Sequence, residues 1–139
     1  MDGQSETRGL AAPQVIAIGT QAGAIRDPRR PDILAHSLVE GSAMVGVARL
    51  GRDTVHALWE RHDGGDEVLM LAEGRLSLIL RDDNGDRVLT AGPGDAILIP
   101  RGVAHSFKIE SDEIRLLFIT PRSGNVGWDE DGTPVKRHP

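Results

Sequence analysis

The stretch that decides the fold class is residues 94–105, which read Gly-Asp-Ala-Ile-Leu-Ile-Pro-Arg-Gly-Val-Ala-His. A strand enters a tight turn at Pro-Arg-Gly, and the chain then reverses to place His105 on the next strand. Short apolar runs with glycine and proline between them recur along the chain, which has 17 Gly and 8 Pro among 139 residues. This spacing, with about 8 to 12 residues for each strand and turn, predicts an all-β sandwich or barrel.

The expected strands fit one domain, since 139 residues are enough for a single hydrophobic core. The barrel covers residues 33–121, with an N-terminal arm and loop at 1–32 and a C-terminal tail at 122–139. Asn84-Gly85 is the strongest hairpin signal, because both residues tolerate positive φ. Val15–Ile18 is a candidate for one further short strand outside the barrel. The strands expected in the barrel are Ile33–Val39, Met44–Leu50, Thr54–His62, Glu67–Glu73, Arg75–Asp82, Arg87–Ala91, Ala96–Pro100, Ala104–Ile109 and Ile114–Thr120.

The composition argues against several classes of function. Lys and Arg total 16 and Asp and Glu total 21, which gives a net charge of −5 that repels the phosphate backbone of nucleic acids. The chain has no cysteine, so disulfides, thiolate metal sites and thiol catalysis are excluded. No apolar run approaches the roughly 20 residues that span a membrane, and no signal peptide is visible. We therefore expect a cytoplasmic protein with no nucleic-acid or membrane partner.

The expected strands carry apolar residues on both faces. Within Arg75–Asp82, Leu76, Leu78 and Leu80 share one face, while the opposite face also carries Ile79. An apolar outer face indicates that something covers it. A second copy of the chain and the N-terminal arm are the two alternatives, and we expect a homodimer.

Four polar side chains have spacing that suits one bound ion. Glu60 and His62 point the same way, because side chains alternate along a strand. If residues 63–66 form a four-residue hairpin loop, His62 and Glu67 lie opposite each other with Cβ atoms about 5 Å apart. His105 lies on the inward face of its expected strand, and a buried imidazole needs a polar partner. A metal shared by these residues would supply one.

These two segments resemble the paired motifs of the cupin superfamily, and the resemblance covers roughly residues 40–120. The first motif of that family carries two histidines, a glutamate and a distal glycine, and the second carries glycine, proline, glycine and histidine. The resemblance implies a small single-domain cupin, folded as a double-stranded β-helix or jelly-roll barrel with a divalent metal in its interior. The matching positions are His62, Glu67, Gly74, Gly94, Pro100, Gly102 and His105.

The chain departs from this pattern at the first motif histidine, where it has Glu60. Two coordination sets follow. In one, Glu60, His62, Glu67 and His105 all bind the metal; in the other, Glu60 stands aside as a base or an orienting group and the other three form a two-histidine, one-carboxylate set. Mixed imidazole and carboxylate ligands suit Fe, Mn, Ni, Co or Zn.

His56 lies on the same face of its expected strand as Glu60. It is a weaker candidate for lining the pocket or carrying a proton.

The resemblance implies metal-dependent chemistry on a small organic substrate. Cupins of this kind include dioxygenases, isomerases, decarboxylases and polyketide cyclases, so the fold does not name the reaction. The alternative is a non-catalytic module that uses the same pocket to bind or sense a metabolite. We expect an enzyme with one divalent metal ion.

Overall fold

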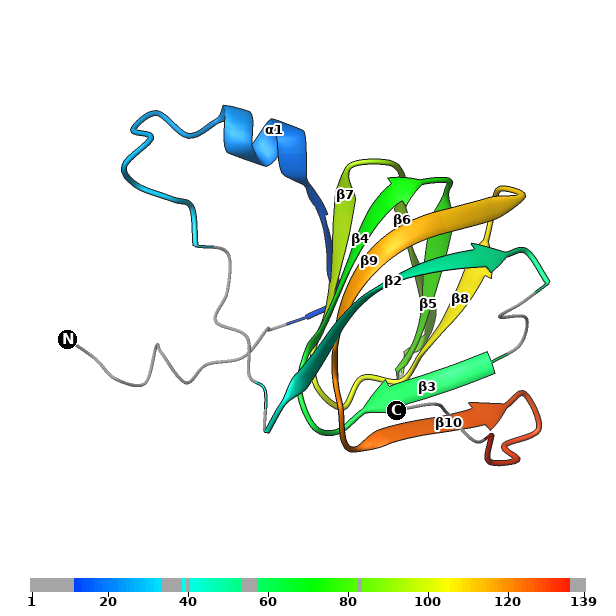
Figure 1. Cartoon of the computed structure of the whole chain (residues 1–139). Coiled ribbons are helices and arrows are strands. Elements are labelled where there is room, and N and C mark those ends of the chain that lie inside the picture. Colours follow the sequence, from blue (N-terminus) through cyan, green and yellow to red (C-terminus); the bar gives the residue numbers. More distant parts are fainter. Residues whose placement is uncertain (1–11, 34–38, 40, 54–57, 83, 136–139) are drawn as a thin grey trace.

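The computed structural model describes residues 12–33, 39, 41–53, 58–82 and 84–135, and these residues form two facing antiparallel sheets (Figure 1). The expected all-β barrel is confirmed. In spatial order, the first sheet contains β1 (Gln14–Ala17), β7 (Asp95–Ile99), β4 (Glu67–Glu73), β9 (Glu113–Pro121) and β2 (Ala43–Gly51). The second sheet contains β10 (Asn125–Asp129), β3 (Leu58–His62), β8 (His105–Ile109), β5 (Leu76–Asp82) and β6 (Gly85–Ala91).

A short helix, α1 (Ile18–Gly23), follows β1 and lies outside the two sheets (Figure 1). None of its side chains is buried, so it adds nothing to the core. No helix among the described residues has the length and apolar character that a membrane span requires.

The strands differ from the expected ones mainly near the chain ends. The strand expected at Ile33–Val39 and the first part of the one expected at Thr54–His62 lie largely outside the described residues. The short strand expected at Val15–Ile18 is present as β1, but Ile18 begins the helix. β10 was not expected: it lies within the segment interpreted as a tail, and pairs along its whole length with β3.

The core lies between the two sheets, and strict alternation of side chains builds it. On β5, Leu76, Leu78 and Leu80 are almost fully buried, and on β7 the same is true of Ile97 and Ile99. Complete burial of one such side chain stabilises a fold by about 1.5 to 3 kcal/mol. The interior is therefore an aliphatic layer that holds both sheets at a fixed separation.

The outer face of the first sheet is apolar and open. Val45 and Val47 on β2 are 69% and 81% exposed, and Met70 on β4 is 39% exposed. Leu117 and Ile119 on β9 pair in register with the two valines, so alternation along the expected strand Ile114–Thr120 places them on this face as well. The homodimer that would cover it stays a prediction.

Gly74 explains why one motif position requires glycine. It has φ +89° in the turn between β4 and β5, and a Cβ atom there would lie 2.3 Å from the backbone oxygen of Glu113. Gly94 has nearly the same φ, +84°, but a Cβ atom at Gly94 would meet no atom within 4 Å. Both sites favour glycine for backbone reasons, and Gly74 additionally needs it for space.

We expect Gly74→Ala to destabilise the protein more than Gly94→Ala, which serves as the matched control. The positive φ costs each variant about 1 to 2 kcal/mol, and the close approach to Glu113 adds about 1 to 3 kcal/mol for Gly74→Ala alone. Urea unfolding followed by circular dichroism measures both losses. Equal losses of stability would show that the strand around Glu113 moves to accept the Cβ atom. Lack of space would then not be a reason for glycine at position 74.

Candidate metal centre

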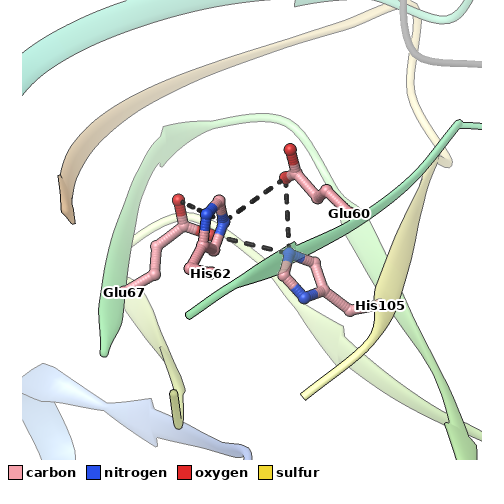
Figure 2. Close-up of side chains that lie close together, drawn as sticks. All are labelled: Glu60, His62, Glu67 and His105. Atoms are coloured by element: carbon pink, nitrogen blue, oxygen red, sulfur yellow. Dashed lines mark hydrogen bonds and ion pairs between the residues drawn. The ribbon is translucent and has the colours of Figure 1, made fainter. Parts of the chain in front are cut away.

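Four buried polar side chains meet inside the barrel: Glu60, His62, Glu67 and His105 (Figure 2). Their exposed fractions are 6%, 5%, 5% and 0%, and one potential ligand atom from each lies within 4.8 Å of all the others. These are the residues that the sequence motifs singled out. The structure therefore brings the four candidate metal ligands to one place.

The shortest separations link each imidazole to a carboxylate (Figure 2). His62 Nε2 lies 3.2 Å from Glu67 Oε2, and His105 Nε2 lies 3.3 Å from Glu60 Oε1. The crossed separations are slightly longer, 3.7 Å from His105 to Glu67 and 3.8 Å from His62 to Glu60. Ligand atoms about 2.1 Å from one ion lie roughly 3 to 3.5 Å apart at neighbouring positions. The four groups have close to the spacing that a shared cation requires.

Strand alternation and register explain how these side chains converge. Glu60 and His62 are two residues apart on β3 and point inward together, as predicted. Glu60 pairs in register with His105 on the neighbouring strand β8. The hairpin expected between His62 and Glu67 is wrong, because β3 and β4 belong to different sheets. Glu67 reaches the centre from the facing sheet, so the site bridges both layers of the barrel.

The turn of the second motif is hydrogen-bonded to the first motif. The backbone N–H of Arg101 donates to the buried carboxylate of Asp66 at 2.8 Å. The N–H of Gly102 donates to the carbonyl of His62 at 2.9 Å, and Gly102 has φ +82°. These bonds hold the loop that precedes His105 against the end of β3. The two motifs form one local structure.

Each imidazole has its Nδ1 atom held by an oxygen acceptor. His62 Nδ1 lies 2.9 Å from Asn125 Oδ1, while Asn125 Nδ2 donates to the carbonyl of Pro121, which fixes the orientation of the amide. His105 Nδ1 lies 2.9 Å from the carbonyl of Val103. Because these oxygens only accept, both rings carry a proton on Nδ1 and present Nε2 to the centre. This is how histidine ligands of metals are usually oriented.

Glu67 is oriented by a hydroxyl group. Thr120 Oγ1 donates to Glu67 Oε2 at 2.7 Å, and both residues are buried. Among the described residues, Glu67 Oε1 and His62 Nε2 are buried atoms that make no hydrogen bond. Burying a polar atom without a partner is costly, and buried polar groups normally have one. A cation between these atoms would satisfy both, so the donor set fits a metal ion.

The electrostatics of the metal-free site centre on His62. Burial by itself lowers the pKa of its imidazole, but the adjacent Glu67 carboxylate, helped by Glu60 and Asn125, outweighs burial and raises the pKa to about 9. A proton on His62 therefore offsets part of the negative charge of the two carboxylates. A metal ion would take over this role and displace the proton.

The remaining predictions have mixed outcomes. His56 lies outside the described residues, so its suggested place in the pocket stays a prediction. Arg61, which lies between Glu60 and His62, points to the opposite face of β3, where its guanidinium pairs with Asp63. Sequence reasoning missed Asn125 and Thr120. The inward parity of Thr120 on its expected strand was a usable signal, whereas Asn125 needed a strand that was not expected.

The comparison with protein families agrees with this architecture. A family model described as a cupin domain matches residues 47–120. A cupin-2 domain containing protein from Shewanella frigidimarina is 22% identical, with 77% of this chain and 94% of that chain covered and a TM-score of 0.47. No curated protein matches the sequence.

Two oxalate decarboxylases share the fold with a TM-score of 0.50. The enzyme from Bacillus subtilis is described as having Mn(II) centres, and it is 13% identical over 64% of this chain. The enzyme from Lactobacillus farciminis, in a formate complex, is 15% identical over 64% of this chain. The matched regions cover only 24% and 27% of those longer chains. With its family match, its two-sheet barrel and its motif residues in place, this chain belongs to the cupin domain family.

Proposed function

We propose that the chain is a metal-dependent enzyme that holds one divalent ion and acts on a small organic substrate. The observation that carries this proposal is the convergence of two imidazole Nε2 atoms and two carboxylates at one buried point, with His62 Nε2 and Glu67 Oε1 making no hydrogen bond. Two nitrogen and two oxygen donors suit Fe, Mn, Co, Ni or Zn.

All four residues would hold the ion. Glu60 is included because its Oε1 atom lies within 3.8 Å of both imidazole Nε2 atoms, so it faces the same point as they do. When bound, such an ion supplies Lewis-acid polarisation of a substrate oxygen, and redox chemistry as well where it is iron or manganese. An ion held by these four residues would also be able to bind a substrate oxygen.

The protein's own contribution is orientation and the exclusion of water. Asn125 and the carbonyl of Val103 hold the two imidazoles, and Thr120 holds one oxygen of Glu67. In the alternative set, in which Glu60 does not bind the ion, its carboxylate beside His105 is the candidate base. The Mn(II) centres of the Bacillus subtilis oxalate decarboxylase support a metal in a barrel of this kind.

Metal analysis of the purified protein tests the site. We expect near-stoichiometric divalent metal in the wild type, and at least a tenfold lower content in His62→Ala and His105→Ala, because each variant loses a nitrogen donor. Gly94→Ala, which leaves the donors intact, is the control for altered folding. Unchanged metal in either histidine variant would remove that residue from the set.

Turnover separates an enzyme from a binding module. Protein reconstituted with iron is assayed for oxygen uptake, and protein reconstituted with Mn, Co, Ni or Zn for conversion of phenols, ketones and keto acids. We expect turnover with at least one metal and its loss in His105→Ala. Tight metal and ligand binding without turnover under any of these conditions would favour the non-catalytic module.

The pKa of His62 predicts how the stability of the metal-free protein depends on pH. The folded-state pKa of about 9 exceeds the ordinary value of 6.5, so protonation of His62 stabilises the fold fully below pH 6.5. This contribution, about 3 kcal/mol, is lost as the pH rises from 6.5 through 9. Denaturant unfolding of chelator-treated protein at several pH values measures it.

The control for this pH dependence is His62→Gln, which cannot be protonated and should show no decline over the same range. Metal-loaded wild type should show none either, because the metal has replaced the proton. A decline that persists in His62→Gln would assign the effect to another group.

Asn125 is expected to set the metal affinity without touching the ion. Asn125→Ala removes the acceptor for His62 Nδ1–H and should weaken cobalt binding by about 10- to 100-fold. Asn125→Asp keeps an oxygen acceptor but loses the bond to Pro121, so affinity close to that of the wild type is expected. Competition with a chromophoric chelator measures both. Equal losses in the two variants would place the effect in the Pro121 turn and not in the orientation of the ring.

A further inference from the structure

We propose that this centre takes an uncharged and largely apolar ligand, one that offers a neutral oxygen donor such as a carbonyl, amide or hydroxyl group. Small carboxylate anions are poor ligands for it. This inference rests on the proposed function and names the substrate class of the same site. It comes from the charge of the donor set, the walls beside it and the placement of the cationic side chains.

The charge of the donor set is the first argument. Glu60 and Glu67 together carry two negative charges, and the Nδ1 contacts of His62 and His105 keep both rings neutral when their Nε2 atoms bind metal. A divalent ion bound by these four groups therefore has no net charge. An arriving anion would leave one uncompensated negative charge in a buried site, which is strongly unfavourable.

The walls beside the donors are apolar. On β4, Leu69 follows Glu67 on the same face, and on β9 Phe118 pairs with Leu69 in register. On β8, Phe107 follows His105, and the centres of these two rings are 5.3 Å apart. On β3, Leu58 lies two residues before Glu60 and points to the same face. A ligand that reaches the ion contacts carbon on several sides.

The two phenylalanines at inward positions keep part of their apolar surface exposed. Phe107 and Phe118 point inward but are only half-buried, in contrast to the fully buried leucines of β5. Phe118 lies over Gly46 on β2, where a Cβ atom would come within 2.5 Å of the ring. Gly46 thus makes room for the ring against the wall of the barrel. Inward aromatic surface of this kind favours an apolar ligand.

The described strands keep their cationic side chains away from the centre. Among the described strands, Arg87 is the only lysine or arginine at an inward position, and it is exposed on the edge strand β6, with β5 between it and β8. Arg61 pairs with Asp63, and Arg81 lies over the ring of Trp59. Sites that recognise carboxylates normally place an arginine or lysine against them.

The test uses the full chain loaded with cobalt(II), whose visible spectrum changes when a ligand binds. The probes are benzamide, benzoate and acetamide: the first two share a shape and differ by one charge, and the third lacks the ring. In the wild type we expect benzamide to bind at least as tightly as benzoate, and about tenfold or more tighter than acetamide because of the apolar walls.

Two variants locate these preferences. Glu60→Gln raises the charge of the loaded site by one and should increase the affinity for benzoate relative to benzamide about tenfold or more. Glu73→Gln, at the far end of β4, makes the same change of charge on an exposed side chain and should leave the ratio unchanged. Phe118→Ala should reduce the preference for benzamide over acetamide, whereas Val47→Ala on the outer face should not.

The outcomes separate this inference from the proposed function. If cobalt does not bind to the wild type, the metal site itself fails. If cobalt binds but benzoate binds more tightly than benzamide, only the inference about ligand class is overturned. The wild-type comparison decides this even if Glu60→Gln loses its cobalt, and Phe118→Ala then tests the apolar wall separately.

Discussion

The structure depends on one electrostatic constraint: two carboxylates, Glu60 and Glu67, are buried close together in an aliphatic interior. Like charges at this distance repel strongly where water is excluded, so positive charge must lie between them. In the metal-free chain, a proton on His62 provides part of it, which is why the pKa of that ring is raised to about 9. A divalent cation balances both carboxylates at once, and it also satisfies His62 Nε2 and Glu67 Oε1, which make no hydrogen bond.

Barrel packing and site geometry are consequences of the same contacts. Glu67 comes from the first sheet and the other three groups come from the second, so the aliphatic layer that sets the distance between the sheets also sets the distances between the ligand atoms. At this end of the barrel, Asp66 and the carbonyl of His62 accept hydrogen bonds from the Pro-Arg-Gly turn. A site held in this way by rigid strands loses little entropy when a metal binds.

The sequence predicted the parts of this arrangement that depend on local geometry. Strand alternation alone placed Glu60, His62 and His105 on inward faces, because the two-residue period is a property of any extended chain. The partner of each strand is a long-range choice, and there the local argument failed. The two glycines between His62 and Glu67 are compatible with a hairpin loop and equally with a connection between two sheets. In the structure they connect the two sheets.

The same distinction explains why Asn125 was missed. Its strand, β10, is short and lies in a glycine- and charge-rich segment, so its stability comes from pairing with β3 and from the contact of Glu130 with the buried Trp59. Nothing within the segment itself shows that partnership. The carboxylate at position 60 and the amide at position 125 contribute to metal binding in two different ways. The carboxylate lowers the charge of the centre, and the amide keeps the His62 ring turned so that its nitrogen, and not its proton, faces the metal.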